Sequence, residues 1–136
     1  MEILFTRTQL DQVVQQFWNA YGDRKVFAFK GEMGAGKTTF VHVLAGLLGV
    51  TDAVSSPTYS IINQYITESG NVMYHMDLYR LKDEEEARAA GVEDILESGK
   101  ICLIEWPERI YDLLPEDTCW IELIHMADGE RLLKIQ

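Results

Sequence analysis

A three-layer α/β sandwich around a mixed central sheet is the fold class that this sequence predicts. Strand-like and helix-like stretches alternate along the chain, a glycine-rich turn joins an early strand to a helix, and acidic residues end two later apolar strands. Two pairs of strand-like stretches are close enough in sequence to form hairpins, so antiparallel strands should accompany the parallel ones. The 136 residues contain no linker or internal repeat, and we expect a single domain over 1–136.

The first expected elements are a short edge strand at residues 3–5 and an amphipathic helix, which Thr6 or Thr8 can cap. Apolar residues then recur at helical spacing until Gly22 ends the pattern. These residues are Leu10, Val13, Val14, Phe17, Trp18 and Tyr21. The helix is therefore expected to cover one face of the sheet, and Trp18 within its apolar stripe is expected to pack in the core.

The glycine-rich turn spans residues 31–39 and reads GEMGAGKTT, which fits the pattern G-x-x-x-x-G-K-S/T. Gly34 and Gly36 carry no Cβ atom, so a phosphate chain can approach the backbone and meet its N–H groups. Lys37 is expected to reach the β- and γ-phosphates, and Thr38 to join the shell of a Mg²⁺ ion. The residues expected to contact the nucleotide here are Glu32, Met33, Gly34, Ala35, Gly36, Lys37, Thr38 and Thr39. The sequence thus predicts a nucleotide triphosphate site.

The elements around this loop are a strand at 26–30 and a helix at 37–48. The helix is apolar nearly all round, so we expect it to be buried on most sides and to stop at Gly49. His42 within it is expected to have a structural or surface role. The polar segment 51–60 follows, with hydroxyl residues clustered around a proline, and a loop in this place can touch the γ-phosphate.

Two acidic residues end later apolar strands. Residues 59–66 and 72–78 are expected to form an antiparallel hairpin whose second arm runs into HMDLYR, which places Asp77 at a strand end. Glu105 ends the apolar stretch of KICLIEW in the same way. A carboxylate in such a place can hold Mg²⁺, directly or through water, or orient the attacking water. Asp77 and Glu105 compete for that role, and both are expected to act in catalysis together with Lys37.

The remaining elements are short. Helices are expected at 83–90 and 92–98, and their many acidic side chains are expected to form a solvated face. A third short helix is expected at 107–113, and a hairpin of 119–126 with 131–135 completes the chain.

Composition limits the possible functions. The net charge of −10 argues against a surface that grips nucleic acid unaided, because such binding needs clustered Lys and Arg. Any role near RNA is therefore expected to run through a partner. Cys102 and Cys119 lack the spacing of a zinc site and fit reduced core thiols. No apolar run is long enough to span a bilayer and no export signal is visible, so we expect a cytoplasmic protein.

Four segments together resemble one known family. GEMGAGKTT, SSPTYS, HMDLYR and LIEWPE, in this order within residues 30–108, are similar to the bacterial TsaE family, formerly called YjeE. The resemblance implies a P-loop ATPase of the tRNA N6-threonylcarbamoyladenosine pathway, with ATP and Mg²⁺ as ligands. It also implies that the TsaB and TsaD proteins are its partners and that tRNA is reached only through their complex. The chain lacks the N/T-K-x-D string of common GTPases, which independently favours ATP over GTP.

The resemblance also assigns residues to roles. It implies three metal ligands: Thr38, Asp77 and Glu105. Glu105 would occupy the Walker B place, Thr58 in the SPT segment would lie near the γ-phosphate, and Trp106 would lie close to the nucleotide. Packing beneath the strand end is an equal alternative for Trp106. Tyr79 and Arg80 match the family pattern too, with roles open between catalysis, partner contact and structure.

Phosphoryl transfer needs cationic groups for the developing charge, and beyond Lys37 only Arg80 lies in a recognisable motif. We therefore expect an ATPase that is slow alone and is stimulated by its partners. One alternative is a small-molecule kinase, although its usual arginine-rich lid is not evident, because the later arginines are widely separated. The other alternative is a nucleotide-gated binding module in which hydrolysis is incidental.

Overall fold

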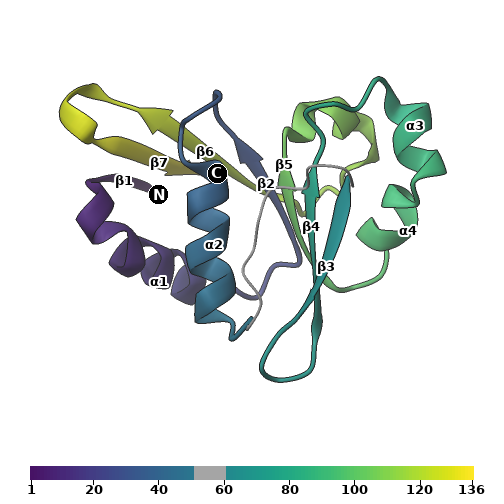
Figure 1. Ribbon diagram of the computed structural model, residues 1–136, viewed down its shortest axis with the longest axis horizontal. Coiled ribbons are helices and arrows are strands. Elements are labelled where there is room, and N and C mark those ends of the chain that lie inside the picture. Colours follow the sequence, from purple (N-terminus) through teal and green to yellow (C-terminus); the bar gives the residue numbers. More distant parts are fainter. Residues whose placement is uncertain (51–60) are drawn as a thin grey trace.

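The computed structural model describes residues 1–50 and 61–136, which form one seven-stranded mixed sheet with helices on both faces (Figure 1). The strand order is β1-β7-β6-β2-β5-β4-β3. The strands are β1 (Glu2–Phe5), β2 (Val26–Lys30), β3 (Ile62–Ile66), β4 (Val72–Asp77), β5 (Ile101–Glu105), β6 (Cys119–His125) and β7 (Arg131–Ile135). The predicted α/β fold with a mixed sheet and the two predicted hairpins are confirmed.

The four central strands are parallel and the flanking strands are antiparallel. Strand β2 pairs in parallel with β5 on one side and β6 on the other, and β4 pairs in parallel with β5. In this register Glu105 lies between Phe29 of β2 and Asp77 of β4. The carboxyl ends of β2, β5 and β4 therefore meet at one edge, where ligands bind in open α/β sheets.

The helices form two groups at opposite ends of the sheet (Figure 1). The α-helices are α1 (Leu10–Tyr21), α2 (Lys37–Leu47), α3 (Glu84–Ala89) and α4 (Val92–Leu96), and the 3₁₀ helices are η1 (Arg7–Gln9), η2 (Pro107–Leu113) and η3 (Ala127–Gly129). Two separate clusters of buried apolar side chains lie on the two faces of the sheet. The α1–α2 cluster contains Phe17, whose ring lies 5.7 Å from that of Phe27 and 5.5 Å from that of Phe40. Trp18 packs against this cluster, as predicted.

Helix α2 differs from its prediction on one side. Its sheet-facing residues are buried, but Leu47 is 40% exposed and His42 is exposed, because α2 lies in an outer layer with one side toward solvent. The expectation that α2 is buried on most sides is therefore wrong for this outer side. Gly49 follows the helix with φ +79°, and a Cβ there would lie 2.4 Å from the Cβ of Glu68, so only glycine fits.

The remaining sequence predictions concern isolated features. Cys102 and Cys119 are both buried and free, and burial raises the pKa of their thiols to about 12 and about 11. Most of the acidic side chains of α3 and α4 are exposed, which confirms the solvated face, whereas Glu84 and Glu86 are half-buried. No helix in residues 1–50 and 61–136 has the length and apolar character of a membrane span.

Candidate functional site

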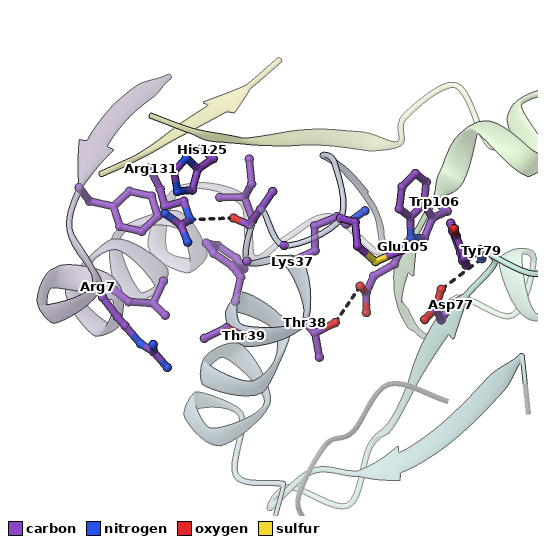
Figure 2. A pocket seen from close by; sticks show the side chains of 18 of the residues that line it. Arg7, Lys37, Thr38, Thr39, Asp77, Tyr79, Glu105, Trp106, His125 and Arg131 are labelled. Carbon is purple, nitrogen blue, oxygen red and sulfur yellow. Dashed lines mark hydrogen bonds between the residues drawn. The ribbon is translucent and has the colours of Figure 1, made fainter. Parts of the chain in front are cut away.

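An open pocket of about 1180 Å³ lies at the edge where the central strands end. Its walls come from η1, the loop between β2 and α2, the ends of β4 and β5, and the β6–β7 hairpin. Figure 2 shows Lys37 near the middle, Arg7, His125 and Arg131 on one side, and Asp77 and Glu105 on the other. The volume is that of a site for a nucleotide-sized ligand.

The glycine-rich loop is open toward this pocket. A Cβ added at Gly34 would meet no atom within 4 Å, and one at Gly36 would meet only the Nε atom of Arg131, at 3.8 Å. Gly36 is also the N-cap of α2, with φ +102° and no side-chain hydrogen bond to cap the helix. The first amides of α2 therefore lack a side-chain partner at the cap and can meet an anion, which the helix dipole also favours.

Lys37 is buried and points into the pocket from the first turn of α2 (Figure 2). Its ammonium donates a hydrogen bond to the carbonyl of Gly31 at 2.5 Å and lies 3.5 Å from the centre of the Trp106 ring. Burial lowers the pKa of Lys37, while nearby carboxylates, Glu105 foremost, act in the opposite direction. Within the described residues the ammonium forms no direct ion pair, so a bound phosphate would supply the missing negative charge.

Glu105 is the acid that contacts the glycine-rich loop and its helix. The hydroxyl of Thr38 donates to Oε1 of Glu105 at 2.9 Å, and Nε2 of His75 lies 2.6 Å from Oε2. Glu105 is only 3% exposed, and His75 is fully buried. Both oxygens of this carboxylate are thus held by named side chains, one of which, His75, was not predicted as a site residue. Its place two residues before Asp77, on the same face of β4, is the signal that could have identified it.

Asp77 lies beside Glu105 on the neighbouring strand but in a different environment. One oxygen, Oδ1, accepts a hydrogen bond from the backbone N–H of Tyr79 at 3.1 Å. Burial raises the pKa of Asp77, and the negative charge of Glu105 adds to this rise. The sequence left Asp77 and Glu105 as alternatives for the same role, but the structure places them differently. Glu105 contacts Thr38 directly, whereas Asp77 lies farther along the pocket wall.

Trp106 follows Glu105 with a left-handed backbone, φ 61° and ψ 51°, which is uncommon for a residue other than glycine. Its ring lines the pocket over Lys37, lies 5.0 Å from the ring of Tyr79 and also packs against the apolar cluster beneath β5. The two alternatives for Trp106 are therefore not exclusive: one ring both packs beneath the strand end and faces the ligand space.

The basic residues at the other end of the pocket were not predicted as site residues. Arg131, the first residue of β7, donates from Nε to the carbonyl of Ala35 at 3.1 Å (Figure 2). Arg7 in η1 and His125 at the end of β6 line the same end. These residues lie in no recognisable motif. Only the strand order β7-β6-β2 brings Arg131 beside the glycine-rich loop.

The other predicted site residues fall in three places. Met33 and Thr39 line the pocket, and Met33 at the tip of the loop is 67% exposed. Glu32 is exposed, and its carbonyl accepts a hydrogen bond from the N–H of Ala35, so it shapes the turn of the loop. Thr58, like the whole SPT segment, lies outside the described residues. In the described part of the chain, no group of three His, Cys, Asp or Glu residues could hold a metal, so an ion would need phosphate oxygens or water in its shell.

Comparisons with known proteins agree with one another. Residues 4–133 match the family described as Threonylcarbamoyl adenosine biosynthesis protein TsaE. Two relatives are named tRNA threonylcarbamoyladenosine biosynthesis protein TsaE. The one from Bacillus subtilis is 39% identical to this chain over 78% of this chain and 65% of the relative. The one from Haemophilus influenzae is 37% identical over 75% of this chain and 64% of the relative. The chain thus spans just under two thirds of the length of these two relatives.

Other relatives match over more of their length. The protein of the same name from Rickettsia bellii is 33% identical over 99% of this chain and 97% of the relative. Among solved structures, the crystal structure of Bacillus subtilis YdiB superposes with a TM-score of 0.75 and 25% identity, over 99% of this chain and 83% of that one. The similarity in sequence and in fold therefore covers the whole pocket region.

Proposed function

The chain belongs to the TsaE family of tRNA threonylcarbamoyladenosine biosynthesis proteins, and we propose that it serves this pathway as a Mg²⁺-dependent ATPase. The observation that carries the proposal is the contact between the Thr38 hydroxyl and the buried Glu105 carboxylate, next to an open glycine-rich loop and a buried lysine. A threonine, an acid and a lysine of this kind hold Mg²⁺ and triphosphate in P-loop proteins. The reaction would convert ATP and water to ADP and phosphate.

In this proposal the loop amides and Lys37 bind the phosphates, and Thr38, Glu105 and Asp77 hold the metal ion. Bound Mg²⁺ would neutralise charge on the phosphate oxygens. Lys37 would exchange its contact with the Trp106 ring for the negative charge of the γ-phosphate. Thr58 would approach the same phosphate. The loop residues from 32 to 39 would surround the phosphate chain, and Trp106 would limit the access of water to it.

We further propose that hydrolysis is slow without partners. Lys37 is the only Lys or Arg of the described residues that is buried among the acids. Arg80 also lines the pocket but is exposed, and Arg7 and Arg131 stand at the opposite end. A cation or a closing loop supplied by a partner would complete the charge stabilisation. The family's pathway makes the TsaB and TsaD proteins the expected partners, with tRNA reached only through them. Because tRNA is their substrate, we place the protein in the cytoplasm.

The test is Mg²⁺-dependent ATP hydrolysis by the purified protein, measured alone and with TsaB and TsaD, beside a Lys37→Ala control. We expect turnover that rises at least tenfold with the partners and is lost in the control. Equal turnover with and without partners would contradict the proposed stimulation. Activity that persists in Lys37→Ala would contradict the site itself.

The competing proposals predict different outcomes. A small-molecule kinase would transfer phosphate to a metabolite and release little of it as inorganic phosphate. A nucleotide-gated binding module would tolerate Glu105→Ala in cells, although turnover is lost. Growth and tRNA modification in a strain that carries only Glu105→Ala distinguish that module from the hydrolytic cycle, which requires both to fail.

A further inference from the structure

His75 is a fully buried histidine in β4, two residues before Asp77. Side chains alternate along a strand, so His75 and Asp77 lie on the same face of the sheet, as do Leu103 and Glu105 on β5. The register pairs His75 with Leu103 and Asp77 with Glu105. His75 is therefore the diagonal neighbour of Glu105, and its ring spans the gap to place Nε2 at 2.6 Å from Oε2.

The hydrogen-bond partners fix which atom donates. A carboxylate oxygen accepts hydrogen bonds, so we assign the hydrogen of this contact to Nε2 of His75. Nδ1, on the other side of the ring, is buried and has no partner among the described residues. Buried polar atoms are usually paired, so a histidine that served only as a core residue would be expected to satisfy both nitrogens. Among the residues that the structure describes, the ring of His75 makes one polar contact, the one to Glu105.

The contact determines how Glu105 is oriented. Oε1 of Glu105 accepts the hydroxyl of Thr38 and Oε2 accepts Nε2–H of His75, so the carboxylate is held from both sides. Without His75, Oε2 would be a buried acceptor with no partner among these side chains, and the group could gain by rotating away from Thr38. Second contacts of this kind commonly orient metal ligands in proteins.

We infer that His75 is a positioning residue, which donates from Nε2 to Oε2 of Glu105 and thereby keeps Oε1 against Thr38. The inference rests on the proposed function, because it concerns Thr38 and Glu105, two of the three residues that we propose to hold Mg²⁺. A residue of purely structural importance would change the free energy of unfolding, but it would leave the Mg²⁺ dependence of nucleotide binding unchanged. That dependence is therefore the quantity to measure.

The experiment compares two substitutions of similar size. In His75→Gln the amide nitrogen reaches about as far as Nε2 and can still donate, whereas His75→Leu removes the donor. Binding of a fluorescent ADP analogue is measured over a titration of Mg²⁺ and in excess EDTA. We expect His75→Leu to need about 10- to 100-fold more Mg²⁺ for half of the effect. We expect His75→Gln to stay within about threefold of the wild type, and all three proteins to bind equally in EDTA.

A double-mutant cycle shows whether His75 acts through Glu105. Glu105→Gln should remove the response to Mg²⁺, and His75→Leu added to Glu105→Gln should change nothing further. A wild-type response to Mg²⁺ in His75→Leu, or equal loss in the Gln and Leu variants, overturns the inference. If Glu105→Gln nevertheless abolishes the response, the proposed function stands. Failure of the wild type to bind the analogue, or an unchanged response in Glu105→Gln, overturns the proposed function as well.

Folding of each variant is checked by circular dichroism and by its Tm. Should His75→Leu fail to fold, His75→Asn replaces it, because the Asn amide reaches only as far as Nδ1 and cannot contact Oε2. The expected result is again a rise of about tenfold or more in the Mg²⁺ requirement. An unchanged requirement in a folded His75→Asn protein overturns the inference.

Discussion

At one end of the pocket the functional groups are buried or half-buried and Glu105 is hydrogen-bonded to two of its neighbours, while at the other end the groups are exposed or half-buried and make few contacts. Glu105 contacts both Thr38 and His75 within 3 Å. Arg7 and His125 are exposed, and Arg131 is fixed to the loop by one hydrogen bond to a carbonyl of that loop. We refer to these as the acidic end and the basic end of the pocket.

The difference separates two kinds of contribution. Groups that are buried and mutually bonded keep one geometry and act on each other in a low dielectric, so small displacements have large effects. Exposed cations attract an anion over a distance but are screened by salt and tolerate displacement. The acidic end should therefore control the rate and the metal dependence, and the basic end should control the affinity.

The largest effect is expected for Glu105→Gln. The amide has the shape of the carboxylate and can still accept the Thr38 hydroxyl, but it lacks the negative charge for Mg²⁺. The kcat for ATP hydrolysis with TsaB and TsaD should fall by about 100-fold or more. Binding of ADP in EDTA should stay within about threefold of the wild type. A kcat close to that of the wild type would show that the acidic end does not control the rate.

Thr38→Val should have the next largest effect, since valine keeps the shape of the side chain and removes the hydroxyl that Glu105 accepts. The Mg²⁺ concentration for half-maximal hydrolysis should rise by about 10- to 100-fold. Thr38→Ser retains the hydroxyl and serves as the control, with a requirement near that of the wild type. Equal behaviour of the Val and Ser variants would contradict a role for the hydroxyl.

The two ends differ just as much in what the sequence could reveal. Thr38 lies in a motif that opens a helix, and Asp77 and Glu105 lie in motifs at the ends of strands. Motifs, helix starts and strand ends are all local properties of the sequence. The mixed sheet followed in the same way from its two hairpins. Arg131 begins an ordinary hairpin strand, and it becomes a pocket residue only through the strand order β7-β6-β2. Strand order depends on the packing of the whole chain, which no local pattern specifies.

A smaller effect is expected at the basic end. Arg131→Met removes a charge that faces the loop. The affinity for ATP should fall by about tenfold, because this is roughly what the loss of one charged hydrogen bond costs. The Mg²⁺ requirement should not change, and the affinity should depend less steeply on salt. Lys134→Met is the control, because it removes a charge from the opposite face of β7, where Lys134 contacts Glu2. A changed Mg²⁺ requirement in Arg131→Met would break the distinction between the two ends.

The smallest effect is expected for Asp77→Asn in the absence of nucleotide and metal. Burial is the main reason that the pKa of Asp77 is raised above 3.8. The folded protein therefore binds this proton more tightly than the unfolded chain does, and at neutral pH the ionised carboxylate lowers the free energy of unfolding. Asn removes that cost and can still accept the N–H of Tyr79, so the Tm at pH 7 should rise by about 1–3 °C. The gain should shrink as the pH falls toward 4, where the wild-type carboxyl is itself protonated.

Asp77→Asn is expected to weaken the stabilisation that ligands give, in contrast to its effect on the free protein. If Asp77 joins the metal site, Mg²⁺ and ADP will stabilise Asp77→Asn less than they stabilise the wild type, because a ligand that binds the folded state more weakly raises the Tm by less. Asp112→Asn, at an exposed position in η2, should leave the Tm unchanged under both conditions. A gain that persists unchanged with Mg²⁺ and ADP would remove Asp77 from the metal site and leave Glu105 and Thr38 as its side-chain ligands.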